Sequence, residues 1–348
     1  MVEKKRFISL DWLRFLACVL VILQHVTEFY YVAPDFTPAR TDNTFLVGIF
    51  NSLSRTSVPL FVIISGFLLL PMKQSTSDFF KRRFTRILYP FLIWSVVYSI
   101  YFALKNDISL LQWIQNVLQI PICYEAEHLW YIYMLIGLYV LVPVLSPWLR
   151  VVSRRELECY LGIWLFTTIL PYIRLLFPTI GADVFFNPSP TFYYFSGFVG
   201  YFLLGHYFRK YETLSSIKSV LAIVVGWVMT SSIFIYQLYN CETIEQLELG
   251  WGFCTFNVVL MCMGVFSLML KIRDTANGVI SRFVSSVSVL SYGIYLVHVL
   301  WLRLYMSLFM PMFDSVISVA LIVVPCTFIS SYLTIWILKH IPGNKYLF

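Results

Sequence analysis

Apolar stretches of about 20 residues recur along the whole chain, and this recurrence restricts the fold more than any other feature. A helix of about 20 residues can cross roughly 30 Å of hydrocarbon. The composition agrees, because 59% of the 348 residues are hydrophobic and only 12% are charged. Soluble domains carry about 25% charged residues. The sequence therefore predicts an all-α polytopic membrane protein.

Ten apolar runs are long enough to be membrane spans, and polar segments separate them. The predicted spans are residues 9–31, 45–71, 84–104, 128–149, 157–177, 191–208, 217–239, 250–270, 284–309 and 315–338. A basic amphipathic stretch, 77–87, leads into the third span, and the helical pattern over 108–120 predicts a helix lying along the interface. The sequence contains no internal repeat, Gly/Ser linker or appended soluble domain. Residues 1–348 are therefore expected to form a single integral-membrane domain.

Basic residues concentrate in every second connecting segment. Nineteen of the 25 Lys and Arg lie in six segments that share one side if there are ten spans, and the other segments are acidic or sparse in charge. The positive-inside rule then places both termini in the cytoplasm. The expected location is the inner (plasma) membrane, among its lipids. The net charge of +7 is a topology signal, and no nucleic-acid partner is expected.

The first predicted span carries four ionisable residues: Asp11, Arg14, His25 and Glu28. Charge inside a membrane is costly and commonly marks a site or a pathway. Arg14 and His25 are 11 residues apart, which returns to within about 20° of the same helical face about 16 Å further along. Asp11 and Glu28 complete one polar stripe. Two structural alternatives stay open, because Arg14 could snorkel with Asp11 as its partner and His25 could hydrogen-bond a neighbouring helix.

Two other segments also contain basic residues at notable positions. Arg83 and Arg86 are three residues apart in "KRRFTRILYP" (81–90), so they share a helical face and could clamp a polyanion. The alternative is that these basic residues only reflect the usual excess of Lys and Arg on the cytoplasmic side of a membrane protein. In the second span, Ser65 and Gly66 permit close helix packing, and Arg55 lies toward the outer end. Arg55 is a candidate for supporting the site or binding an acceptor, with snorkelling as the alternative.

Two segments with histidines complete the candidate site. Glu127 and His128 in "YEAEHLWYIY" could bind or deprotonate an extracytoplasmic hydroxyl, and an exposed interfacial pair is the alternative. The ninth span brings Tyr295 and His298 to a depth comparable to that of His25. The seven cysteines form no CxxC pair and have no histidine at zinc spacing, so no metal is expected.

Five segments together resemble the membrane acyltransferase-3 family. Arg14 and His25 form an R-x10-H pattern, and Arg83 and Arg86 form an R-x-x-R pattern. The matching segments follow the family's order and extend from the first span to the ninth: "LDWLRFLACVLVILQHV", "SVPLFVIISGFLLL", "RRFTRILYP", "HLWYIYMLIGLYVLVPVL" and "SYGIYLVHVL". Within the family, the chain is most similar to stand-alone O-acetyltransferases of the enterobacterial common antigen type.

This resemblance implies transfer of an acyl group, most commonly acetyl, from cytoplasmic acyl-CoA to a hydroxyl of a cell-surface glycan or glycolipid precursor. The donor would be acetyl-CoA. The family's essential residues correspond to His25 and Arg14, and its arginine pair to Arg83 and Arg86. Many relatives carry an additional periplasmic esterase-like domain, and this sequence shows none. The chain is therefore expected to modify its acceptor directly or to pass the acyl group to a separate glycan-assembly protein.

A mechanism follows if these residues act together. The arginines would bind the CoA phosphates, and His25 would act as general base on the acceptor hydroxyl while Glu28 orients its ring. An acetyl-histidine intermediate is the competing route. A transporter or flippase for a polysaccharide or lipid-linked intermediate is the alternative function, and a sensor or scaffold is the third. A homo-oligomer is compatible with each of them.

Overall fold

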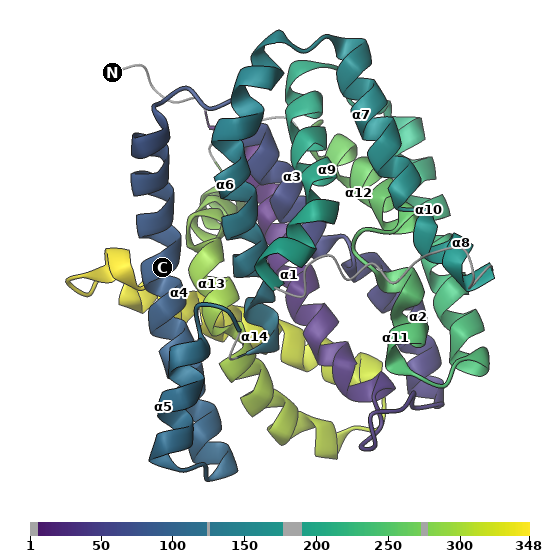
Figure 1. The fold of residues 1–348 in the computed structure, drawn as a ribbon. Coiled ribbons are helices and arrows are strands. Elements are labelled where there is room, and N and C mark those ends of the chain that lie inside the picture. Colours follow the sequence, from purple (N-terminus) through teal and green to yellow (C-terminus); the bar gives the residue numbers. More distant parts are fainter. Residues whose placement is uncertain (1–5, 124–125, 177–189, 273–277) are drawn as a thin grey trace.

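The computed structural model describes residues 6–123, 126–176, 190–272 and 278–348, and the described part is helical throughout apart from one isolated bridge between Val32 and Pro38. Figure 1 shows the helices as one bundle. The elements are α1 (Ile8–Tyr31), α2 (Asp42–Ser54), α3 (Ser57–Leu69), α4 (Thr76–Asn106), α5 (Leu110–Gln119), η1 (Glu127–Leu129), α6 (Trp130–Val151), α7 (Arg154–Thr167), α8 (Leu170–Leu176), α9 (Pro190–Lys210), α10 (Ser216–Asn240), α11 (Ile244–Leu247), η2 (Glu248–Trp251), α12 (Phe256–Met269), α13 (Val279–Phe309), η3 (Met310–Met312), α14 (Val316–Leu338) and η4 (Asn344–Tyr346).

Eight helical segments in the described part are long and apolar enough to cross a membrane. They correspond to eight of the ten predicted spans, so the prediction of a polytopic helical membrane protein is confirmed. The other two predicted spans, 157–177 and 191–208, coincide with α7 and α8 and with α9. The count of ten and the cytoplasmic placement of the termini stay predictions.

Two predicted spans are interrupted rather than continuous. The span predicted over 45–71 consists of α2 and α3, which are separated at Arg55 and Thr56. Pro59 follows in the first turn of α3, where its missing N–H removes no helical hydrogen bond. The region predicted as 157–177 divides into α7 and α8. Hydropathy averaged over a whole span does not detect such breaks, because the apolar residues continue on both sides of the turn.

The helices α3 and α9 approach each other at glycines. A Cβ atom added to Gly66 would lie 1.9 Å from the carbonyl oxygen of Phe202, and one added to Gly205 would lie 2.1 Å from that of Ile63. No larger residue fits at either position without moving a helix. This contact confirms the close approach predicted at Gly66 and shows the role that small residues play in membrane helix packing.

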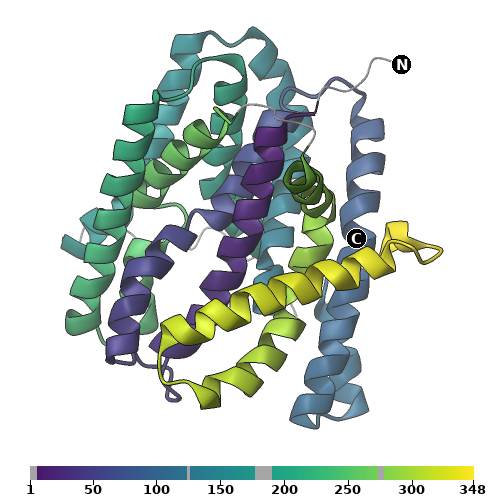
Figure 2. The same cartoon turned by 180° about the vertical axis from the view of Figure 1, so that it is seen from behind.

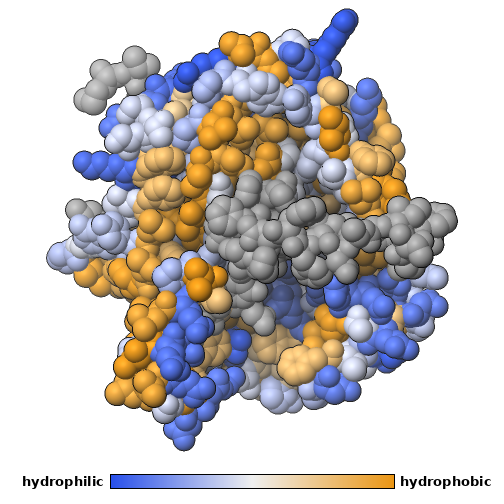
Figure 3. Space-filling view, in the orientation of Figure 1, coloured by the Kyte–Doolittle hydropathy of each residue, from blue (hydrophilic) through white to orange (hydrophobic). Residues whose placement is uncertain are grey.

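Much of the bundle's outer surface is apolar, as expected for a surface that faces lipid. On α10 the exposed side chains include Val220, Leu221, Val224 and Val228. Figure 3 shows apolar side chains over much of the visible flank, while hydrophilic ones gather toward the two ends. The helix α5 confirms the prediction of a helix over 108–120, and all of its side chains are exposed or half-buried.

The helix α1 lies inside the bundle and holds the predicted polar stripe. Figures 1 and 2 show it surrounded by the other helices, and it contacts α2, α3, α13 and α14. It is continuous over 24 residues, so the spacing between Arg14 and His25 is set by one unbroken helix. The predicted basic stretch 77–87 is part of α4, which at 31 residues is about 46 Å long and exceeds the hydrocarbon thickness.

Candidate functional site

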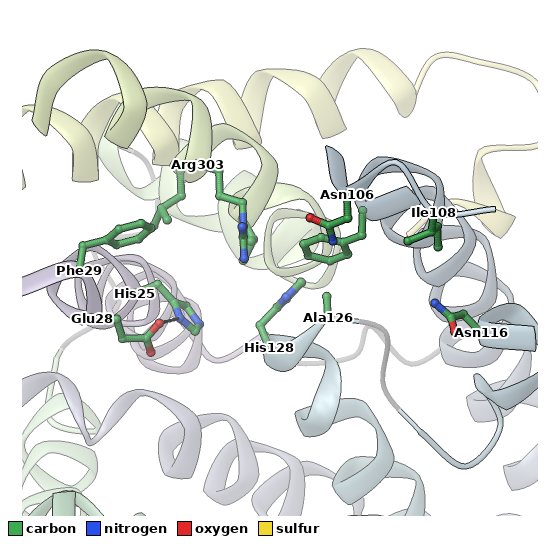
Figure 4. A pocket seen from close by; sticks show the side chains of 12 residues that line it. His25, Glu28, Phe29, Asn106, Ile108, Asn116, Ala126, His128 and Arg303 are labelled. Atoms are coloured by element: carbon green, nitrogen blue, oxygen red, sulfur yellow. Dashed lines mark hydrogen bonds and ion pairs between the residues drawn. The ribbon is translucent and has the colours of Figure 1, made fainter. Parts of the chain in front are cut away.

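A pocket of about 390 Å³ lies at the end of α1 that carries His25, and we call it the histidine pocket. Its walls come from α1, α4, α5, α13 and the turn η1 (Figure 4). The residues that line it are His25, Glu28, Phe29, Phe102, Asn106, Ile108, Asn116, Ala126, His128, Val299, Leu302 and Arg303. Three residues proposed from the sequence, His25, Glu28 and His128, therefore lie together around one cavity.

His25 and Glu28 form a pair on the last two turns of α1. Nδ1 of His25 lies 3.0 Å from Oε2 of Glu28, within hydrogen-bond distance. Their spacing of three residues places both side chains on one face of the helix. The His25 side chain is 18% exposed and that of Glu28 is 36% exposed, so the pair is in contact with the pocket rather than sealed in the core.

Three histidines meet at this site, although they come from three separate elements. The ring centroid of His25 lies 5.4 Å from that of His298 on α13 and 6.5 Å from that of His128 on η1. His128 and His298 are themselves 5.4 Å apart. His298, which the sequence places at a depth comparable to that of His25, thus lies beside it. His128 lies beside both and is 4% exposed, which contradicts the alternative of an exposed interfacial position.

Contacts with two tyrosines, Tyr295 and Tyr98, hold His128 and His298 in place. The Tyr295 hydroxyl donates a hydrogen bond to the His128 carbonyl, and the ring of Tyr98 packs edge-on against the His128 ring at 4.8 Å. Nδ1 of His298 lies 2.6 Å from the Tyr295 carbonyl oxygen and so donates to it. Both histidines are buried, and among the described residues Nε2 of each has no hydrogen-bond partner. Two polar nitrogens are thus left available beside the His25 ring.

Arg14 lies at the opposite end of the polar stripe and outside the histidine pocket. Its Nη1 donates to the Ser288 hydroxyl at 3.1 Å and lies 3.7 Å from Oδ1 of Asp11. Asp11 is buried, and its nearest cation is Arg6 at 2.6 Å. The predicted partnership of Asp11 with Arg14 is therefore present, but Asp11 is shared with Arg6 and with two α13 serines.

The two arginines of the predicted phosphate clamp differ in their exposure to solvent. Arg83 is half-buried, whereas Arg86 is exposed. Arg83 and Arg86 occupy the part of α4 that precedes Pro90, at the end where α1 begins (Figure 1). Arg83 is therefore the more enclosed of the two clamp residues.

Arg55 does not line the histidine pocket. Arg55 is 5% exposed, and its guanidinium lies 4.1 Å from the centroid of the Trp251 ring. Its Nε and Nη2 have no hydrogen-bond partner among the described residues. This position contradicts the alternative that Arg55 snorkels, because the side chain is enclosed by the fold; its role in supporting the site or binding an acceptor stays a prediction. Glu127 belongs to η1, but its side chain lies outside the described residues.

The sequence reasoning missed several residues of the pocket wall, above all Arg303. This arginine lies within the ninth predicted span, and the rule that intramembrane charge marks a site would have selected it. Asn106 and Asn116 gave no such signal, since amides at the ends of helices are common. Figure 4 shows Arg303 directed into the pocket from above His25 and His128, with the two asparagines on the other side.

The arrangement can move a proton. If Nδ1–H of His25 donates to the Glu28 carboxylate, the lone pair is on Nε2, and Glu28 stabilises the imidazolium that forms when Nε2 takes up a proton. The pocket beside the pair is large enough for a small polar group of a substrate. Such a site suits general-base chemistry on a hydroxyl.

Fold and site together define a polytopic helical membrane protein with a histidine–carboxylate pair in an accessible pocket. Residues 7–338 match the family described as "Acyltransferase domain" (Acyl_transf_3), so the chain belongs to the acyltransferase-3 family. The family resemblance seen in the sequence is confirmed. Comparison with curated proteins and with solved structures gives no match.

Proposed function

We propose that the protein is a membrane O-acyltransferase. It transfers an acyl group, most commonly acetyl, from cytoplasmic acyl-CoA to a hydroxyl of a cell-surface glycan or glycolipid precursor. The observation that carries this proposal is the His25–Glu28 pair, 3.0 Å apart beside a pocket, in a chain of an acyltransferase family. The stand-alone enterobacterial common antigen type, located in the inner membrane, is the proposed subgroup.

The proposed reaction is direct transfer. Nε2 of His25 removes the proton of the acceptor hydroxyl, and the oxygen attacks the thioester carbonyl carbon. The C–S bond breaks, the CoA thiolate leaves, and the proton held by His25 returns to that thiolate. Glu28 stabilises the imidazolium between these two steps. The free Nε2 atoms of His128 and His298 are positioned to interact with the groups that react beside His25.

The donor would bind at the end of the stripe that carries Arg14. Arg14 and Arg83, with Arg86 further out, supply cationic donors for the CoA phosphates. The eleven residues from Arg14 to His25 on a continuous α1 correspond to about 16 Å, which is of the order of an extended pantetheine arm. The charged part of the donor therefore stays at one end while the thioester reaches the other.

Purified protein in lipid nanodiscs, supplied with radiolabelled acetyl-CoA and a panel of glycan acceptors, tests the proposal. Wild type is expected to form acetylated product, and His25→Ala is expected to lower kcat at least 10³-fold while still binding acetyl-CoA. Turnover by His25→Ala at the wild-type rate would overturn the assignment. Label that stays on His25 in the absence of acceptor would replace direct transfer with the acetyl-histidine route.

A further inference from the structure

Arg303 in the histidine pocket is a cation with no ion-pair partner among the residues that the structure describes. It lies near the end of α13, and its guanidinium carbon is 5.1 Å from the centroid of the Phe102 ring. Within the described part of the chain, the guanidinium has neither an ion-pair partner nor a hydrogen bond. Glu28 is the one carboxylate among the described lining residues, and it is already paired with His25. The charge of Arg303 is thus available to something that enters the pocket.

The rest of the pocket wall has the chemistry of a carbohydrate site. Asn106 and Asn116 each offer an amide that can both donate to and accept from hydroxyl groups. Phe29 and Phe102 provide aromatic rings against which the apolar face of a sugar can pack. Figure 4 shows Arg303 on one side of the cavity, Asn116 on the other, and the His25–Glu28 pair facing the same space.

We propose that Arg303 binds an anionic group of the acyl acceptor, so that the histidine pocket selects a glycan carrying a carboxylate or a phosphate close to the hydroxyl that reacts. This inference rests on the proposed function, which supplies the acceptor. Arg303 holds the anion through charge-assisted hydrogen bonds, and the two amides bind neighbouring hydroxyls. One hydroxyl is then directed to His25.

Snorkelling toward the lipid headgroups does not account for this geometry. A snorkelling arginine extends its head away from the protein into water, whereas Arg303 lines the same cavity as His25 and His128. Its guanidinium also makes a cation–π contact with the Phe102 ring, which helps to hold the charged group beside the pocket. The alternative that Arg303 stabilises the negative charge developing on the thioester oxygen makes a different kinetic prediction, which the experiment below separates.

The test measures binding of simple sugars to the full-length protein in nanodiscs without acetyl-CoA. The probes are methyl glucuronide, methyl glucoside 6-phosphate and the neutral methyl glucoside, and dissociation constants come from saturation-transfer NMR. Wild type is expected to bind at least one anionic sugar about tenfold more tightly than the neutral one, which corresponds to one charge-assisted contact. The carboxylate and phosphate arms show which anion fits.

Three variants make the result specific. Arg303→Gln is expected to bind the anionic and neutral sugars with equal affinity, and Arg303→Lys is expected to keep part of the preference. Lys105→Gln removes an exposed charge from the end of α4 that carries Asn106. Lys105 does not line the pocket, so this variant should keep the wild-type preference for anionic sugars. Thermal unfolding of each variant in the nanodisc establishes that it is folded.

The proposal is overturned if wild type binds the sugars equally or binds none, or if the preference survives in folded Arg303→Gln. In turnover assays, loss of anion binding raises KM for the anionic acceptor alone, whereas loss of oxyanion stabilisation lowers kcat for charged and neutral acceptors equally. The latter pattern would also overturn it. Failure of the proposed function would show instead as unchanged turnover in His25→Ala, a result that the sugar-binding measurement does not depend on.

Discussion

Replacing Glu28 by Gln removes one negative charge from the site while keeping an oxygen that can accept the hydrogen bond of His25. The carboxylate lies 3.0 Å from Nδ1. The glutamine can hold the ring in the same orientation, so the substitution isolates the charge. During transfer the imidazole becomes a cation, and only then does the carboxylate contribute more than the amide. The expected effect is therefore on kcat, with the KM for acetyl-CoA unchanged.

The size of the effect follows from the exposure of the pair. Hydrogen bonds to charged groups contribute about 1.5–3 kcal/mol, and neutral ones about 1 kcal/mol. The difference between the two is about 0.5–2 kcal/mol, and because Glu28 is 36% exposed, solvent screening keeps this difference below the top of that range, at about 1.4 kcal/mol. That difference corresponds to a roughly tenfold lower kcat. A fully buried acid in a catalytic triad would instead cost about 10⁴-fold.

Acetyl transfer from labelled acetyl-CoA by nanodisc-embedded protein, with kcat and KM separated, measures this effect. The matched control is Glu245→Gln, which removes the same charge from an exposed position on α11 outside the pocket. Its kcat should equal that of wild type. An unchanged kcat in folded Glu28→Gln would refute the role given to the carboxylate, and a loss of about 10⁴ would refute the argument from exposure.

Three further substitutions test the binding of the donor, the packing of two helices and the role of a buried arginine. Arg14→Gln should raise the KM for acetyl-CoA about tenfold with little change in kcat, because one charge-assisted contact to phosphate is lost; a lower kcat at constant KM would contradict this. Gly66→Ala should lower the thermal unfolding temperature markedly, whereas Gly162→Ala, whose added Cβ meets nothing within 4 Å, should not; equal shifts would show that the helix contact is unimportant. Arg55→Met should leave transfer intact and leave stability unchanged or raised. It removes two buried guanidinium nitrogens that have no hydrogen-bond partner among the described residues, and this gain offsets the lost contact with the Trp251 ring. Lost transfer by the folded variant would place Arg55 in the reaction.

The polar stripe of α1 could be predicted from the sequence because it depends on a single helix. Periodicity fixes which residues share a face, and the rise per residue fixes their separation, so the sequence predicts one pair, Asp11 and Arg14, and a second pair, His25 and Glu28, further along the same helix. The His25–Glu28 contact and the proximity of Asp11 to Arg14 follow from spacing of three residues. The breaks in the spans over 45–71 and 157–177 could not be predicted, since hydropathy does not register a turn inside an apolar run.

The proximity of the three histidines, by contrast, could not be predicted from the sequence. Sequence gives the depth of His25 and of His298 but not which helices are neighbours, because lateral packing depends on many small contacts of similar energy. The position of His128 depends in addition on the short turn η1 between α5 and α6. Arg303 could have been identified from the sequence, because it is a charged residue inside a predicted membrane span.

The helix α13 gives the stripe on α1 a fixed partner at both ends. At one end Ser288 donates to Asp11 and accepts from Arg14, and at the other the His298 ring lies 5.4 Å from that of His25. The distance between the proposed phosphate contact and the proposed base is therefore set by two packed helices rather than by one. Interiors packed in this way resist compression and extension. A rigid separation of about 16 Å suits a donor whose charged and reactive ends are themselves joined by an arm of fixed maximum length, and it explains why residues so far apart on one helix can serve one reaction.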